Sequence, residues 1–139
     1  MRFTWYKVVV IGIVLSLVIP VQGQNKKEIR EKGISSISVE EYFIEEGIDK
    51  PVIESIEKYN KDGELVEIQV FNSRGEVKTW EKYVYDDKGW LVEEIFLDEK
   101  GKIVRTEKSI YENGLKVEKQ FFNERDKLYK KKKYVYDYR

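Results

Sequence analysis

Residues 59–65 of this chain read Tyr59-Asn60-Lys61-Asp62-Gly63-Glu64-Leu65, and the same type of heptapeptide recurs to the end of the sequence. Each copy has an aromatic residue or leucine, then Asn or Asp, two polar residues, Gly, a variable residue and an apolar one. The further copies begin at Phe71, Tyr85, Leu97, Tyr111 and Phe122. The copy at Tyr111 is shortened, and the copy at Phe122 has Asp126 in the glycine position. Repeats of this kind decide the architecture of a chain.

The spacing of the copies shows a longer unit. Successive turn positions lie 12, 14, 12, 13 and 12 residues apart, so two short copies make one unit of 25–26 residues. The same period separates four tyrosines, which are Tyr59, Tyr85, Tyr111 and Tyr136. The repeating unit therefore contains two turns and two intervening segments.

The residues at the turns predict β-hairpins. Asn or Asp at the first position and Gly at the fourth are typical of a type I turn closed by a left-handed residue, which leads into a G1 bulge. Asn113-Gly114 is typical of the shorter type I′ turn and would place Ile110 opposite Val117. Asp126 replaces glycine because Asp tolerates positive φ better than most residues. Segments of about 8–10 residues between turns span roughly 30 Å as strands.

The sequence predicts an all-β fold, an antiparallel meander of about eight strands from 25–26-residue hairpin repeats. Two further strands, over Ile34–Ile44 and Val52–Tyr59, precede the repeats, with a short helix over Val39–Glu46 as the alternative to part of the first. Charged residues such as Glu67, Lys82 and Glu93 lie at strand centres on both faces, whereas a sandwich needs one apolar face per strand. We therefore expect an open, curved sheet, with a closed eight-stranded barrel as the alternative.

The N-terminus predicts export. Basic Arg2 and Lys7 precede an apolar stretch of about 12 residues, and Pro20 and small residues follow it, which is the pattern of a secretory signal peptide. We expect a signal peptide over residues 1–23, cleaved between Gly23 and Gln24, and the alternative is an uncleaved anchor. Residues 24–33 are predicted to be a polar, loose leader, and residues 34–139 a single hairpin-repeat domain. No transmembrane segment is expected after cleavage, and the predicted location is the periplasm or the extracellular space.

The repeat resembles a known family. The motif Tyr-Asn/Asp-x-x-Gly-x-Leu/Val across residues 59–136 resembles the YD repeats of bacterial RHS-type secreted proteins, and more closely the small exported bacterial proteins built from such hairpins. The segment Tyr111-Glu112-Asn113-Gly114 is also similar to the MORN-variant repeats of YwqK-type antitoxin proteins, although those repeats have more glycines and a different period. Neither family has catalytic residues in its repeat, so the resemblance implies none here.

Composition limits the chemistry. The chain has 139 residues, 26 basic and 26 acidic residues, and neither His nor Cys. Disulfides, thiolate nucleophiles, Ser-His-Asp catalysis and the usual zinc and haem ligand sets are therefore excluded. Paired carboxylates such as Glu93-Glu94 should point to opposite faces of a strand rather than converge. Asn60, Asp62, Asp86 and Asp87 could supply calcium ligands, but turn formation already explains them. No catalytic, cofactor-binding or metal-binding residue is predicted, and no cofactor.

Two groups of residues are candidates for contact with a ligand or partner. Trp80, Trp90, Tyr83 and Tyr85 could form a sugar-stacking platform, and cross-strand aromatic pairing is the alternative. Lys130, Lys131, Lys132 and Lys133 could meet an anionic surface, or could protect an edge strand from aggregation. Residues 115–139 carry a net charge of +5 and residues 34–67 a net charge of −7. This asymmetry favours either closure of the first strand on the last or head-to-tail association.

The predicted function is that of an exported, non-enzymatic binding or structural protein of the bacterial envelope. The alternative is an inhibitor or immunity-like protein that pairs its sheet edge with a partner strand. The partner is unknown from the sequence; another envelope protein or a polysaccharide is consistent with the residues, whereas nucleic acid is not expected.

Overall fold

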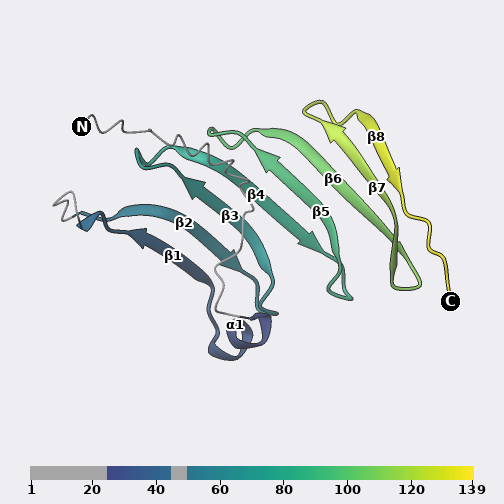
Figure 1. Cartoon of the computed structure of the whole chain (residues 1–139), viewed down its shortest axis with the longest axis horizontal. Coiled ribbons are helices and arrows are strands. Elements are labelled where there is room, and N and C mark those ends of the chain that lie inside the picture. Colours follow the sequence, from purple (N-terminus) through teal and green to yellow (C-terminus); the bar gives the residue numbers. More distant parts are fainter. Residues whose placement is uncertain (1–24, 45–49) are drawn as a thin grey trace, which may run out of the picture.

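The computed structural model describes residues 25–44 and 50–139, which form one short helix and one eight-stranded antiparallel sheet (Figure 1). The predicted signal peptide and the loop before Pro51 lie largely outside the described residues. The elements are α1 (Lys26–Lys32), β1 (Ser36–Glu41), β2 (Val52–Tyr59), β3 (Leu65–Phe71), β4 (Val77–Tyr85), β5 (Leu91–Leu97), β6 (Ile103–Glu112), β7 (Leu115–Asn123) and β8 (Leu128–Lys133).

The strands follow one another in the sheet in chain order, from β1 to β8, and the sheet is not closed into a barrel (Figure 1). The predicted antiparallel meander is therefore confirmed, in its open form. Among the described residues β1 and β8 each pair on one side only, with β2 and β7 respectively. Both ends of the sheet thus present a strand edge.

The turns have the predicted chemistry. In the β4–β5 turn, Asp86 Oδ1 accepts hydrogen bonds from the backbone N of Lys88 (3.0 Å) and of Trp90 (2.8 Å), and Gly89 has a φ of 78°. The Asn or Asp at the start of the other four turns of this type accepts the same two bonds; these residues are Asn60, Asn72, Asp98 and Asn123. Asp126 replaces glycine with a φ of 55°. Asn113 and Gly114 both have positive φ, as a type I′ turn requires.

Every hairpin also contains one irregularity in register. The extra residue always lies near the start of the second strand; the seven residues are Glu54, Val66, Lys78, Val92, Val104, Val117 and Tyr129. A β-bulge increases the local twist and bends the strand, so a bulge at the same place in each hairpin accounts for the curvature in Figure 1. It also makes the predicted pairing of Ile110 with Val117 wrong, because Ile110 pairs with Glu118.

Three of the four repeated tyrosines join successive hairpins, whereas Tyr59 donates to Glu57 within β2. Tyr85 Oη donates to the backbone O of Leu65 (3.0 Å), beyond the last backbone pair between β3 and β4. Tyr111 and Tyr136 make the same bond to the residue twenty positions earlier, at 3.1 and 2.7 Å. The 25–26-residue period is therefore a period of hydrogen bonding between neighbouring hairpins as well as of turns.

The leader is not loose, and this corrects the prediction for residues 24–33. The segment forms α1, with Asn25 Oδ1 accepting from the backbone N of Glu28 (3.0 Å) and Gly33 in the left-handed conformation at the C-terminal end. Seven residues do not form a stable helix alone; the apolar Ile29 is 1% exposed, and the helix contacts the β2–β3 turn. No helix within residues 25–44 and 50–139 is long and apolar enough to cross a membrane.

The first strand is shorter than predicted, since β1 ends at Glu41 rather than Ile44. The described part of Val39–Glu46 therefore begins as strand, which favours the strand over the helical alternative there. Residues 45 and 46 lie outside the described part. The second predicted strand, Val52–Tyr59, has the expected bounds.

Candidate functional site

The register defines two faces of a single-layered sheet. Glu57, Ile68, Glu81, Phe96 and Arg105 are successive cross-strand neighbours from β2 to β6, and we call their side the Glu57 face. The opposite side carries Gln69, Trp80, Leu97, Lys108 and Phe122, and we call it the Trp80 face. Only three hydrophobic residues of the described chain are buried, namely Ile29, Ile68 and Phe121. Polar contacts between strands therefore contribute much of the stability of the sheet.

The densest polar network lies on the Glu57 face. Lys119 Nζ lies 2.6 Å from Glu94 Oε2 and 2.5 Å from Glu107 Oε2, and Arg105 Nε lies 3.0 Å from Glu107 Oε1. Burial lowers the pKa of Lys119, but the hydrogen bonds to Glu107 and Glu94 outweigh it, so the net pKa is raised. The carboxylates of Glu94 and Glu107 are therefore both ion-paired. Glu94 and Lys119 are one repeat period apart, which is the sequence signal that could have identified the pair.

A second network joins α1 to the turns of the sheet. Glu64, which is 8% exposed, accepts from Lys26 Nζ (2.6 Å) and from Asn60 Nδ2 (2.9 Å). These two bonds lower the pKa of Glu64 below its ordinary value of 4.5. Glu64 also lies close to Gly89 in the β4–β5 turn, so it connects the helix with two hairpins.

We expect Glu64→Gln to weaken the attachment of α1. Because the pKa of Glu64 is lowered in the folded chain, the contribution of the carboxylate is complete above its ordinary pKa of 4.5 and is lost as the pH falls through the lower folded value. The variant should be less stable at pH 7, by an amount on the order of 1 kcal/mol for a charge-assisted hydrogen bond. Chemical unfolding at pH 7 and at pH 3 measures this, with Glu76→Gln, at an exposed equivalent position, as the control. An equal loss at both pH values would contradict the assignment.

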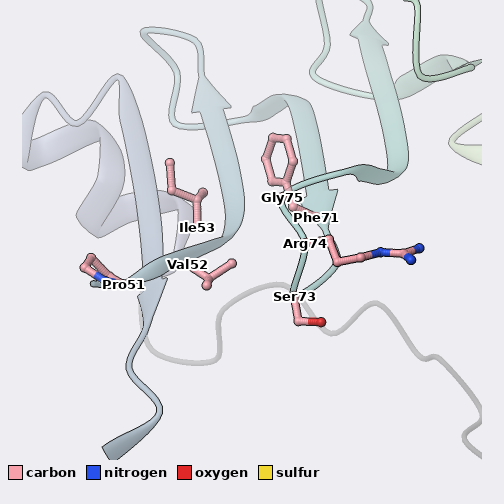
Figure 2. Close-up of a pocket in the computed structure, with 7 residues that line it drawn as sticks. All are labelled: Pro51, Val52, Ile53, Phe71, Ser73, Arg74 and Gly75. Carbon is pink, nitrogen blue, oxygen red and sulfur yellow. The ribbon is translucent and has the colours of Figure 1, made fainter. Parts of the chain in front are cut away.

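One pocket lies between the start of β2 and the β3–β4 turn (Figure 2). Its volume is about 370 Å³, and its lining consists of Pro51, Val52, Ile53, Phe71, Ser73, Arg74 and Gly75. Figure 2 shows Arg74 extending away from Pro51, Val52 and Ile53, and its guanidinium pairs with Glu76 at 2.9 Å. The lining is thus mainly apolar and contains no carboxylate.

The four predicted aromatic residues do not form one platform. The ring of Trp80 lies against Gly101, in a turn at one end of the sheet, and Trp80 Nε1 donates to Glu67 (2.9 Å). The ring of Trp90 lies near Gly114, in a turn at the other end, and 4.9 Å from the ring of Tyr111. Each tryptophan therefore covers a turn of a neighbouring hairpin.

The two tyrosines are also engaged within the sheet. Tyr83 lies on the Glu57 face and donates to Glu81 (2.7 Å), while Tyr85 makes the bond to the Leu65 carbonyl described above. Burial, followed by the bond to Glu81, raises the pKa of Tyr83, and burial raises that of Tyr85. The Tyr83 bond therefore lies within β4, and the Tyr85 bond crosses from β4 to β3.

The four predicted lysines lie together on β8, in which every residue is exposed. Lys130 and Lys132 are on the Glu57 face, with their ammonium groups 4.7 and 5.6 Å from the Phe121 ring centre. Lys131 and Lys133 are on the Trp80 face, opposite Gln120 and Glu118. Lys131 Nζ lies 3.6 Å from Glu118. The lysines thus divide between the faces but share one edge.

The predicted acidic pairs separate as expected on strands. Glu93 lies on the Trp80 face near Lys108 (3.7 Å), and Glu94 lies on the Glu57 face near Lys119. Within the part of the chain that the structure describes, no group of three or more His, Cys, Asp or Glu side chains is arranged to hold a metal ion.

The open edge of β8 is the candidate interaction site. The backbone N of Tyr134 donates to the backbone O of Val117 (3.0 Å), which continues the β7–β8 register past Lys133. Because backbone groups of an antiparallel strand alternate in direction, those of Lys131 and Lys133 point to the open edge. This strand therefore presents both unpaired backbone groups and positive charge. No protein-family model and no curated protein sequence matches the chain.

Proposed function

We propose that this chain is an exported, non-enzymatic binding protein of the bacterial envelope, and that it binds its partner by pairing a strand along the open edge of β8. The observation that carries the proposal is β8 itself, an edge strand with all six residues exposed. Addition of an extended segment to an exposed sheet edge is a recurring mode of protein recognition. Export is supported by the signal-like pattern of residues 1–23.

The charges of the sheet support a binding role. Several carboxylates at strand centres are paired with cations on other strands, as at Glu67–Lys58 between β3 and β2 and Glu94–Lys119 between β5 and β7. On β8, by contrast, the ammonium groups of Lys130 and Lys132 lie over an aromatic ring. Lysines on an edge discourage pairing with a second basic strand. The edge is therefore suited to a strand that carries acidic residues.

We expect Lys131→Pro to abolish binding at this edge while the sheet remains folded. Proline removes the N–H that points away from β7, and a proline is tolerated on an edge strand in that orientation. The matched control is Lys131→Thr, which loses the same charge and the same contact with Glu118 but keeps the N–H. In a pull-down from the envelope fraction with residues 24–139, the original chain and Lys131→Thr should retain a stoichiometric complex, and Lys131→Pro should lose it.

Two results would contradict the proposed function. One is an equal yield of the complex with Lys131→Pro and Lys131→Thr. The other is the absence of a stoichiometric complex, of this chain with another protein or with itself, for all three proteins. Circular dichroism of each variant checks that the sheet is intact.

A further inference from the structure

We infer that the strand paired with β8 is β1 of a second copy of this chain, so that copies join head to tail into a continued sheet. The inference rests on the proposed function and names the partner. Its basis is the fit between the two edges in strand direction, in backbone alternation and in charge.

Strand direction allows the continuation. The sheet has eight strands in antiparallel order, so β1 and β8 run in opposite directions. A second copy added beside β8 in the same orientation would place its β1 antiparallel to β8. The alternation of the meander would then continue across the junction, as it would with a ninth strand.

The backbone groups at the two edges also match. Tyr59 N donates to Ser35 O (2.9 Å), in register with the β1–β2 pairs Ser36–Lys58 and Ser38–Ile56. The alternation then directs the backbone groups of Ser36, Ser38 and Glu40 to the outer edge of β1. The side chains of Ser36 and Ser38 lie on the Trp80 face, as do those of Lys131 and Lys133. The Trp80 faces of two copies would therefore be continuous.

One register pairs opposite charges on both faces. If Lys131 lies opposite Glu40 of the second copy, Lys130 lies opposite Glu41. Opposite charges at directly facing positions stabilise a strand pair, and like charges destabilise it. An antiparallel pair of two β8 strands would instead bring lysine runs together, whereas two fully aligned β1 strands would place Glu40 opposite Ile37 and Glu41 opposite Ser36, without an opposite charge. The charges therefore select the junction of unlike edges.

Exposed apolar side chains lie at the same two edges. Tyr42, just after β1, is 53% exposed, and Tyr129 in β8 is 55% exposed. Tyr129 is the bulge residue of β8, and its ring lies 6.4 Å from that of Phe121 on the Glu57 face. In the register above, both tyrosines lie at the junction. Val135, which is 91% exposed, would lie opposite Ser36. The junction would thus cover apolar surface as well as pair charges.

A junction of unlike edges does not close on itself. Each added copy presents a new β8 edge, so head-to-tail contacts of this kind give open-ended assemblies unless a rotation closes a ring. The assembly should grow with protein concentration. It should weaken with salt, because its charge pairs are at the surface and the Debye length falls from about 30 Å at 0.01 M to about 3 Å at 1 M ionic strength.

Two charge-reversed variants test the inference. Residues 24–139 with Lys130→Glu and Lys131→Glu, and the same chain with Glu40→Lys and Glu41→Lys, each place like charges at the junction. In sedimentation velocity at low ionic strength, the original chain should show a sedimentation coefficient that rises with concentration. Each variant alone should have a dissociation constant at least about 10-fold higher. An equimolar mixture should restore association, because β8 of each variant then meets oppositely charged β1 of the other.

The mixture also controls for misfolding, since two unfolded variants would not restore association. The inference is overturned if the original chain stays monomeric at every concentration at low ionic strength. It is also overturned if either variant alone associates as the original chain does, or if the mixture remains monomeric while both variants are folded by circular dichroism. The Lys131→Pro pull-down decides the proposed function separately: loss of a complex with another protein, together with a monomeric original chain, retains the function and rejects the second copy as partner.

Discussion

Replacement of Gly63 by alanine should destabilise the chain by about 2–4 kcal/mol, which is in the upper range for a single substitution. Gly63 has a φ of 79°, where an L-residue with a Cβ is strained by about 1–2 kcal/mol. In addition, the new Cβ would overlap the backbone oxygen of Lys26 and lie 3.1 Å from the backbone N of Arg30. Both atoms belong to α1, so a side-chain rotation does not relieve the contact. The helix must move away from the turn.

The matched control is Gly75→Ala. Gly75 has a φ of 77° in the same type of turn, but no atom lies within 4 Å of the added Cβ. This variant should lose only the conformational contribution, about 1–2 kcal/mol. Urea unfolding measures both free energies, and hydrogen exchange of residues 26–32 should increase in Gly63→Ala alone. Equal losses in the two variants would show that α1 does not depend on contact with the turn.

Replacement of Lys119 by methionine should destabilise the chain by about 3–5 kcal/mol, the usual effect of removing one member of a buried ion network. Glu94 and Glu107 face each other directly across β5 and β6, and Lys119 bridges them. The side chains of all three residues are at most 20% exposed. Methionine keeps the length of the side chain but leaves two facing carboxylates without the shared ammonium group.

A second substitution separates charge repulsion from loss of packing. Glu107→Gln in the Lys119→Met background removes one of the facing charges and should restore part of the stability, although Glu107→Gln alone, which breaks two ion pairs, should destabilise the chain.

The pKa of Lys119 is raised above its ordinary value of 10.5. Its contribution is therefore complete below that value and is lost as the pH rises through the folded value. The difference between the original chain and Lys119→Met should be the same at pH 7 and pH 9 by urea unfolding; additive effects of the two substitutions would contradict the network.

The hairpins could be predicted because their determinants are local. Asp86 and Gly89 form their turn from side-chain and backbone preferences within five residues, and the same motif recurs at a constant spacing. The open sheet could also be expected, because charges at strand centres on both faces are incompatible with a dry interface between two sheets. These features do not depend on long-range contacts.

The predictions that were wrong depended on contacts across the chain. The polar composition of residues 24–33 predicts a loose leader, yet Asn25 and Gly33 cap α1, Ile29 is buried and the helix contacts the turn at Gly63. Ile110 was expected opposite Val117 because a two-residue turn alone sets that register, whereas a bulge follows the turn.

The candidate site divides in the same way. The run Lys130–Lys133 and its place on the last strand can be predicted from the sequence alone, because a run of consecutive lysines is recognised without the fold. The register alone shows that the backbone groups of Lys131 point to the open edge. The even number of strands in the sheet shows that β1 presents an edge of matching direction.

The amino-acid sequence by itself determined the turns, the 25–26-residue period and the antiparallel meander, because each rests on residues that interact within one hairpin. The tertiary structure decided how the sheet curves, that α1 covers one end, and that Lys119 joins Glu94 to Glu107. The physical reason is that curvature accumulates from seven small bulges and ion networks form between strands. Both depend on how hairpins stack side by side, which no single repeat encodes.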